Sequence, residues 1–323
     1  ESGSHMGPIR PARRRTWGYL GGIFGVTTTQ VAKISGPATA MQTGLLYESG
    51  LSGKPWVNLE QVVIDLQPGA VTPAGLKAAW TALAHRHQAL RSVFVADAEL
   101  GLQIETHPLP DFGFEVQSVE PLPSNLTQFL RQDRDRGADP LGFPNWRVTC
   151  LDRGAAGLTL VWTIHHALVD GTAMRIVLED LHDLLTDQPL APPQDPALAD
   201  LDRQLCAQDK DAARAYFQTT LADPLGPTAW LTASDHPPGR IQRLTHTLPR
   251  ATFDALRETV ALMGATPLNA VQAAWALVQA RWGGQSRAAF GLVDSGRSLL
   301  RAYAQTVGCM ISTLPMQVDL GAH

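Results

Sequence analysis

The amino-acid sequence predicts an α/β protein with two lobes. The chain has 323 residues, of which 44% are hydrophobic, and so exceeds the ~250 to 300 residues at which a single core usually stops growing. Short apolar segments rich in β-branched residues alternate with segments whose apolar residues recur at helical spacing. Residues 187–196 contain four prolines and few apolar side chains, which indicates a linker between the lobes.

The first half opens with a predicted strand and a predicted helix. Residues 56–66 combine alternation with β-branched side chains and are followed by Pro68-Gly69, as expected of a strand that ends in a turn. In residues 73–90 apolar side chains recur at helical spacing, and Thr72 is placed to cap the helix. Further strands are predicted at residues 92–96, 102–106, 114–118 and 146–151, with a helix at residues 125–136.

A buried strand is predicted directly before two adjacent histidines. Residues 158–164 are apolar and β-rich, and residues 172–185 form a predicted helix. His165 and His166 therefore lie in a loop between a strand and a helix, where functional residues are often found. After the linker, helices are predicted at residues 201–221, 252–263 and 267–282, and strands at residues 240–248, 287–293 and 309–318.

Charge and composition exclude several classes of protein. A net charge of -4 and a pI near 6.2 produce no field that would attract nucleic acid or an anionic membrane. The chain has no run of about 18 apolar residues and no signal peptide, so we expect a cytoplasmic protein. Residues 1–10 are interpreted as a tag or linker. Three separated cysteines fit neither a disulfide framework nor a zinc site and are expected in the core: Cys150, Cys206 and Cys309. Three tryptophans are also expected in the core: Trp80, Trp162 and Trp275.

The two histidines are the main candidates for chemistry. Because neighbouring residues of a strand point to opposite faces, only one of them can face a cavity while the other packs inward. A neutral imidazole can accept a proton near pH 7, which makes histidine the most common general base. Asp170 could orient the loop or pair with a distant arginine, and Gly171 permits a tight backbone turn beside a ligand. A histidine pair is more often structural than catalytic, so other segments must decide.

Five segments of the chain carry short motifs. The histidine run, residues 163–173, contains His-His-x-x-x-Asp-Gly, and four other segments read ATAMQTGLL at residues 38–46, RHQALRSVF at 86–94, FGLVDSGR at 290–297 and VGCMISTLP at 307–315. In this order they resemble the motifs of condensation domains from nonribosomal peptide synthetases: an opening motif in which a glutamine precedes the first helix, RHExLRTxF, HHxxxDG, FGxxxSGR and (I/V)GxFVNTLP. The chain departs from these patterns at Gln88, Ser92 and Ser312. Arg86 and Arg91 of the second segment are expected to make structural ion pairs.

The resemblance implies two lobes similar to chloramphenicol acetyltransferase, arranged as a V, with mixed sheets flanked by helices. With the boundary in the proline-rich linker, residues 34–190 form the N-terminal lobe and residues 191–323 the C-terminal lobe. Later motifs of the family have no counterpart, so the second lobe is expected to be incomplete. Residues 11–33 are β-rich and interrupted by glycine, and we interpret them as a β-hairpin that docks an upstream synthase subunit; a plain linker or an added strand are the alternatives.

The resemblance also implies a chemistry. An amine or an alcohol would attack an acyl thioester on the phosphopantetheine of a carrier protein, giving an amide or an ester in nonribosomal peptide or hybrid polyketide biosynthesis. Acyl or peptidyl carrier proteins would be the partners on the donor and acceptor sides, and no cofactor or metal would be bound directly. His166 would be the catalytic residue and His165 structural, Asp170 would fix the loop by pairing with Arg297, and Gly171 would lie beside the pantetheine or the developing oxyanion.

Three alternatives stay open. An epimerisation domain shares the paired histidines. An O-acyltransferase that uses acyl-CoA shares HxxxDG but normally lacks the doubled histidine. A silent module that recruits carrier or partner proteins would use the same fold without chemistry, although such relatives tend to lose the residues that are present here. Substitution of His166 separates an enzyme from a silent module.

Overall fold

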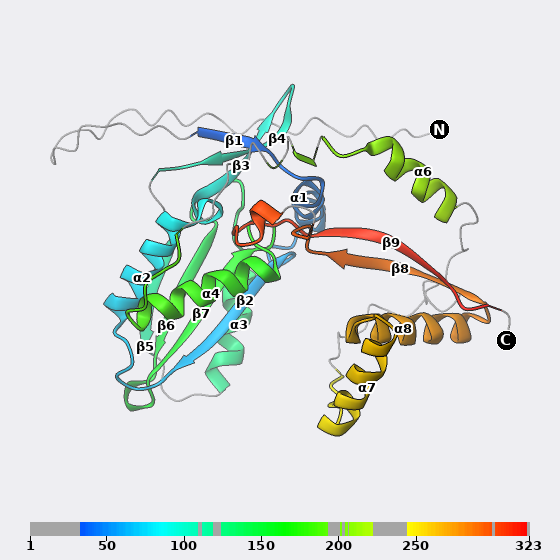
Figure 1. Cartoon of the computed structure of the whole chain (residues 1–323). Coiled ribbons are helices and arrows are strands. Elements are labelled where there is room, and N and C mark those ends of the chain that lie inside the picture. Colours follow the sequence, from blue (N-terminus) through cyan, green and yellow to red (C-terminus); the bar gives the residue numbers. More distant parts are fainter. Residues whose placement is uncertain are drawn as a thin grey trace, which may run out of the picture. The chain divides into compact units, whose positions relative to one another are not determined.

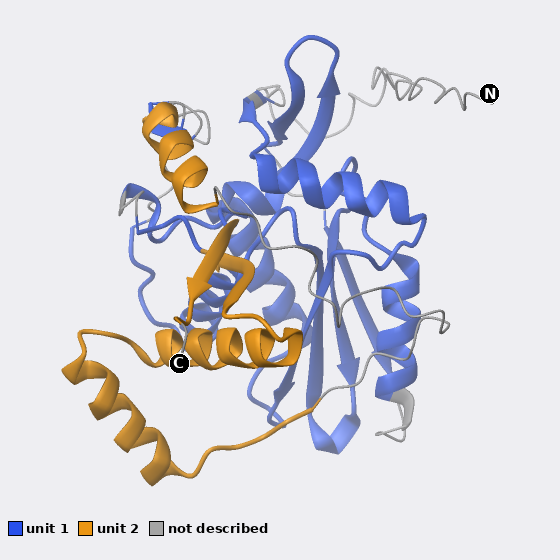
Figure 2. Ribbon diagram, turned by 90° about the vertical axis from the view of Figure 1, so that its right-hand side faces the viewer, with its two compact units in different colours: residues 1–207, 295–312 blue, residues 208–294, 313–323 orange. Residues whose placement is uncertain are grey.

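The computed structural model describes residues 33–108, 112–118, 124–192, 201, 204–205, 207–221, 244–298 and 301–321. These residues fall into two units (Figure 2): the first holds those up to Ala207 and Ser295–Ser312, and the second holds Gln208–Asp294 and those from Thr313 onward. The sequence placed the boundary after residue 190, whereas the first unit continues past it because Leu201 is buried in its core. The predicted docking hairpin, residues 11–33, lies outside the described residues apart from its last residue.

The first unit is built around a four-stranded sheet in the order β2-β7-β6-β5 (Figure 1). Its strands are β2 (Leu59–Leu66), β5 (Gly113–Ser118), β6 (Trp146–Asp152) and β7 (Leu158–His165). β7 runs antiparallel to both of its neighbours, and β5 runs parallel to β6. Every residue of β7 is buried, as predicted for the apolar run that precedes the histidines.

Three helices cover the two faces of this sheet: α2 (Pro73–Arg86), α3 (Ser124–Arg136) and α4 (Gly171–Leu185). On one face, Arg147 of β6 and Thr163 of β7 each donate a hydrogen bond of 2.5 Å to the buried Asp133 of α3. On the other face, Trp162 of β7 packs against Trp80 of α2 with ring centroids 5.0 Å apart, and α2 packs against α4. Both of these tryptophans are fully buried, as predicted.

A second sheet and a first helix complete the surroundings of the loop. The sheet has the order β1-β4-β3, formed by β1 (Lys33–Pro37), β3 (Ser92–Asp97) and β4 (Gly101–Thr106), all antiparallel. Helix α1 (Ala40–Ser52) begins after a capping box made by Thr39 and Gln42. The expectation that Gln42 precedes the first helix is therefore wrong, because Gln42 lies inside the first turn and its side chain helps to cap it. The predicted helix at 73–90 ends at Arg86, and a 3₁₀ turn follows at Gln88–Arg91.

The second unit contains α6 (Lys210–Thr220), α7 (Arg250–Leu262), α8 (Pro267–Gly283) and a two-stranded sheet of β8 (Arg287–Asp294) and β9 (Ser312–Asp319). The strand predicted at residues 240–248 is wrong for residues 244–248, which are irregular, because both leucines of the segment are exposed and the alternation faces no core. Trp275 of α8 was expected in the core but is 43% exposed. Among the described residues, no single helix could cross a membrane by its length and apolarity, whereas α7 and α8 together could but are bent by 95°.

Candidate active site

The paired histidines lie where β7 ends and α4 begins. β7 ends at His165, residues 166–168 form a turn, and Asp170 is the N-cap of α4. The Oδ1 atom of Asp170 accepts a hydrogen bond of 2.8 Å from the backbone N–H of Ala173, which satisfies one of the free donors of the first helical turn. The order of strand, loop and helix is the one that the sequence predicts.

His166 is partly exposed and is held by two backbone groups. Its own N–H donates to the carbonyl oxygen of Asn58 at 2.7 Å, which continues the pairing of β2 with β7. Its Nδ1 lies 2.7 Å from the carbonyl oxygen of Val169. Because a carbonyl oxygen can only accept, Nδ1 carries the proton in the neutral ring, and the lone pair is on Nε2. The imidazole is therefore oriented with a proton-accepting nitrogen.

His165 is buried and has the opposite tautomer. Its Nδ1 accepts a hydrogen bond of 3.1 Å from the backbone N–H of Ala167, and its Nε2 lies 3.0 Å from the hydroxyl of Ser49. Burial, and to a smaller extent the nearby His166, lowers the pKa of His165 to about 4, so the ring is neutral near pH 7. The two histidines point to different surroundings, as the alternation of a strand requires.

Helix α1 holds the loop from one side through Gln42. The Nε2 of this buried glutamine donates to the carbonyl oxygen of Ala167 at 3.1 Å, and its Oε1 accepts from the backbone N–H of Thr39 at 2.9 Å. The motif at residues 38–46 pointed to this glutamine but gave it no role. Its contact with the loop joins residues 125 positions apart, which no local pattern could predict.

Asp170 and Arg297 form a buried ion pair within the first unit. Their side chains are 0% and 6% exposed, and Nη1 of Arg297 lies 2.7 Å from Oδ2 of Asp170. The same oxygen accepts from the backbone N–H of Met310 at 2.9 Å. Nη2 of Arg297 donates to two carbonyl oxygens, those of Thr306 at 3.1 Å and Gly308 at 3.2 Å. Arg297 and Met310 are thereby fixed at the first turn of α4, and Thr306 and Gly308 are held through Arg297.

Two glycines of the motifs differ in what the fold demands of them. Gly296 has a φ of 68°, and a Cβ there would lie 2.8 Å from the carbonyl oxygen of Met310, so only glycine fits before Arg297. Gly171 has no such constraint, because a Cβ at this position would meet no atom within 4 Å. Packing therefore does not require glycine at this exposed first position of α4.

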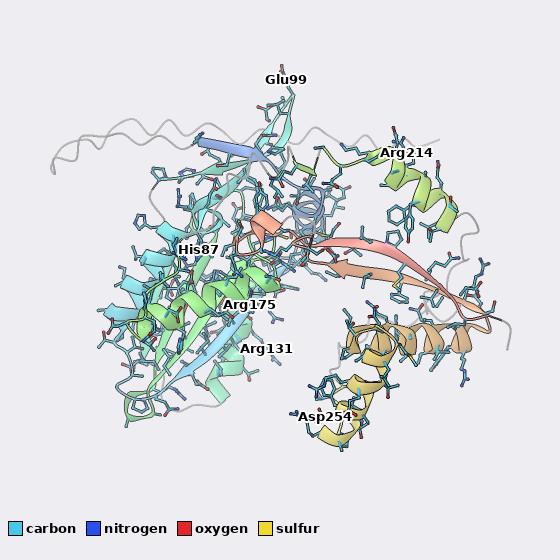
Figure 3. The ribbon with its side chains drawn as sticks, in the orientation of Figure 1. His87, Glu99, Arg131, Arg175, Arg214 and Asp254 are labelled. Atoms are coloured by element: carbon cyan, nitrogen blue, oxygen red, sulfur yellow. The ribbon has the colours of Figure 1, made fainter. Side chains whose placement is uncertain are left out.

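The RHQALR segment connects α2 to α4. Nε of Arg86 and Nε2 of His87 lie 2.6 and 2.9 Å from the same carboxylate oxygen of Asp180, which confirms the structural ion pair predicted for Arg86. Burial lowers the pKa of His87 more than Asp180 raises it. Figure 3 shows His87 beside α4. Arg91 instead donates to the carbonyl oxygen of His107 at 2.8 Å and pairs with no carboxylate among the described residues, so the ion pair predicted for it is not found there.

Two cavities of the first unit adjoin the loop. One, of about 40 Å³, is lined by Gln42, Leu168 and Met310, among other residues. The other, of about 340 Å³, is lined by Ser49, by His165, by residues that precede β2 and by residues at and after the end of α3. In the part of the chain that the structure describes, no group of three or more His, Cys, Asp or Glu side chains could hold a metal ion. Cys150 and Cys309 are buried and unpaired with each other, and Cys206 lies outside the described residues.

Comparison with known proteins identifies relatives over nearly the whole chain. A family model for the condensation domain matches residues 35–323. Nonribosomal peptide synthetase 5 of Aspergillus fumigatus is 31% identical over 300 residues, which cover 88% of this chain and 13% of that protein. A linear gramicidin synthase protein of Brevibacillus parabrevis is 28% identical over 310 residues, which cover 89% of this chain and 6% of that protein. The chain thus spans a small part of these relatives.

Solved structures with the same fold include condensation domains of other synthases. The condensation domain of the Monacolin K polyketide synthase MokA superposes with a TM-score of 0.73 at 18% identity, covering 89% of this chain and 68% of that one. The first condensation domain of the calcium-dependent antibiotic synthetase gives a TM-score of 0.70 at 18% identity, covering 90% of this chain and 70% of that one. These similarities confirm the predicted α/β fold, with sheets flanked by helices.

Proposed function

The chain belongs to the condensation domain family, and from this premise we propose that it catalyses the attack of an amine or an alcohol on a carrier-bound acyl thioester. The product is an amide or an ester of a nonribosomal peptide or a hybrid polyketide. One observation carries the proposal: His166 is partly exposed and has its Nδ1 proton bound to the carbonyl oxygen of Val169, so that Nε2 is free to accept a proton. The partners are acyl or peptidyl carrier proteins, which bring the phosphopantetheine as part of the substrate.

In the proposed reaction, the nucleophile attacks the thioester carbonyl carbon while Nε2 of His166 accepts its proton. The tetrahedral intermediate then collapses, the carbon–sulfur bond breaks, and the thiolate takes the proton back from the imidazole. A positioned acid or base contributes about 100- to 10,000-fold to such a step. Holding both reactants in place can supply up to about 7 to 11 kcal/mol more. An alcohol depends on the base more than a neutral amine does.

The other predicted residues have supporting roles. His165, with its pKa lowered by burial, stays neutral and accepts a hydrogen bond from the loop. Asp170 and Arg297 fix the N-terminus of α4, which follows the loop. Gly171 leaves room for the pantetheine at the exposed start of this helix. Residues 11–33 are proposed to dock an upstream synthase subunit.

The test uses the chain with an acyl-loaded carrier and either an amine or an alcohol acceptor, and measures the product by mass spectrometry. His166→Ala should lower the rate about 100- to 10,000-fold, with the larger loss for the alcohol. His182→Ala is the matched control, because His182 is an exposed histidine of α4. Equal rates for the wild type and His166→Ala would overturn the proposal.

The same assay separates the alternative activities. An epimerisation domain would change the configuration of the carrier-bound residue without any acceptor. An O-acyltransferase would use acyl-CoA in place of the loaded carrier. A recruitment module would bind the carrier equally well with and without His166 and would form no product.

A further inference from the structure

A serine of α1 lies against the buried histidine of the pair. The Oγ atom of Ser49 is 2.9 Å from the carbonyl oxygen of Leu45, 3.0 Å from Nε2 of His165 and 3.1 Å from Nδ2 of Asn58. A hydroxyl group has one proton to donate and two lone pairs. One of two carbonyl oxygens takes that proton, that of Leu45 or that of Val57 at 3.3 Å, and the amide is itself a donor. The remaining lone pair therefore accepts from Nε2 of His165.

This hydrogen bond stabilises the tautomer of His165 that the loop also requires. With the proton on Nε2, Nδ1 has a lone pair, and it accepts from the backbone N–H of Ala167 at 3.1 Å. In the other tautomer, or in the protonated ring, Nδ1–H would face that N–H and the contact would be lost. The hydroxyl of Ser49 therefore acts, through the imidazole, on the backbone of the residue that follows His166.

Asn58 acts on both histidines. It lies directly before β2 in a left-handed conformation, with a φ of 58°. Its carbonyl oxygen accepts from the N–H of His166 at 2.7 Å. Its side-chain amide donates to the hydroxyl of Ser49 and, at 2.9 Å, to the carbonyl oxygen of Leu45. The turn before β2 is thus connected to His166 through its backbone and to His165 through Ser49.

We propose that Ser49 and Asn58 are positioning residues of the active site, which hold the loop around His166 by fixing the ring of His165. Neither residue lies in one of the five motifs. The inference rests on the proposed role of His166, because the loop that is held carries this side chain. It gives a function to the contact between Ser49 of α1 and His165 of β7, which are 116 positions apart in the sequence.

The test compares Ser49→Ala, Ser49→Thr and Asn58→Gly with the wild type and with Ser52→Ala. Ser52 is a matched control, because it lies on the same helix and donates to the carbonyl oxygen of Ser49 without contacting the loop. Threonine keeps the hydroxyl, and glycine at position 58 keeps the left-handed backbone while removing the amide. Two quantities are measured: kcat and KM for the loaded carrier, and the ring nitrogen chemical shifts of the histidines, which report the tautomer of His165.

We expect Ser49→Ala to lower kcat by about tenfold or more, as when a buried donor loses its acceptor, with KM little changed and the ring nitrogen shifts of His165 moved away from those of the pure Nε2–H tautomer. Ser49→Thr should restore both, Asn58→Gly should lower kcat less, and Ser52→Ala should change neither. If Ser49→Ala does not fold, Ser49→Cys gives the same comparison with a weaker acceptor.

An unchanged tautomer signal and an unchanged kcat in Ser49→Ala would overturn the inference. A fall in thermal stability alone, with the same kcat for each folded molecule, would also overturn it, since that is what a merely structural contact would produce. The chemical shifts do not depend on turnover. If the wild type formed no product while the tautomer still required Ser49, the proposed function would fail and the hydrogen-bond relay would stand.

Discussion

Replacing Arg297 with methionine should strongly destabilise the first unit. The substitution keeps most of the side-chain volume but leaves the carboxylate of Asp170, which is 0% exposed, without its charged partner. Removing one partner of a buried ion pair typically costs about 3 to 5 kcal/mol. For a unit of this size each kcal/mol lowers Tm by about 2 to 4 °C, so we expect a decrease of about 6 to 20 °C.

Thermal unfolding followed by circular dichroism measures this effect, with Arg175→Met as the matched control. Arg175 is on the same helix, α4 (Figure 3). It pairs with Glu179, but these side chains are 51% and 58% exposed. An exposed pair of this kind contributes at most about 1 kcal/mol. The double variant with Asp170→Asn should lose less than the sum of the single variants, because the two charges are removed together. If Arg297→Met loses no more stability than Arg175→Met, the reasoning is refuted.

Three further predictions concern pH and backbone space. Burial lowers the pKa of His165 to about 4 from its ordinary 6.5, so between these pH values the unfolded chain binds a proton that the folded chain does not. The free energy of unfolding should therefore fall by about 3 kcal/mol as the pH falls from 6.5 to 4. Urea midpoints measured across this range should fall less steeply with pH in His165→Gln than in the wild type. Burial raises the pKa of Asp133, but the hydrogen bonds and charge of Arg147, with other donors, lower this pKa overall below its ordinary 3.8. The ionised Asp133 therefore contributes to stability above pH 3.8, and this contribution is lost below it. Arg147→Met should move acid unfolding to higher pH. Gly171→Ala should change the free energy of unfolding by at most about 1 kcal/mol yet slow condensation. Gly157→Ala should strongly lower the free energy of unfolding of the first unit, because a Cβ there would lie 2.3 Å from a backbone oxygen at a φ of 90°. Equal stability of these two glycine variants would contradict the packing argument.

The sequence predicted the parts of the site that depend on local patterns. The apolar, β-rich run before His165 is typical of a buried strand, and Asp170 is an N-cap of an ordinary kind. The loop, the strand before it and the helix after it therefore follow from residues that are close in sequence. The missed start of α1 also has a local signal: Thr39 and Gln42 are spaced as a capping box, which would have placed the glutamine inside the helix.

The remainder could not be read from local patterns, for two physical reasons. Ser49 and Asn58 are common polar residues whose role depends on contacts with a strand more than 100 positions away. Trp275 and residues 244–248 show the second reason: periodicity tells which side chains share a face, but not whether another element covers that face.

The two histidines have opposite tautomers because the loop presents a carbonyl to one ring and an N–H to the other. The carbonyl of Val169 requires a proton on Nδ1 of His166, and the N–H of Ala167 requires a lone pair on Nδ1 of His165. Val169 directly precedes Asp170, so the ion pair of Asp170 with Arg297 also fixes the carbonyl that orients His166. Loss of this pair should therefore free the ring of His166 as well as weaken the fold. Arg297→Met should accordingly reduce the rate of each folded molecule, an effect that stability alone does not explain.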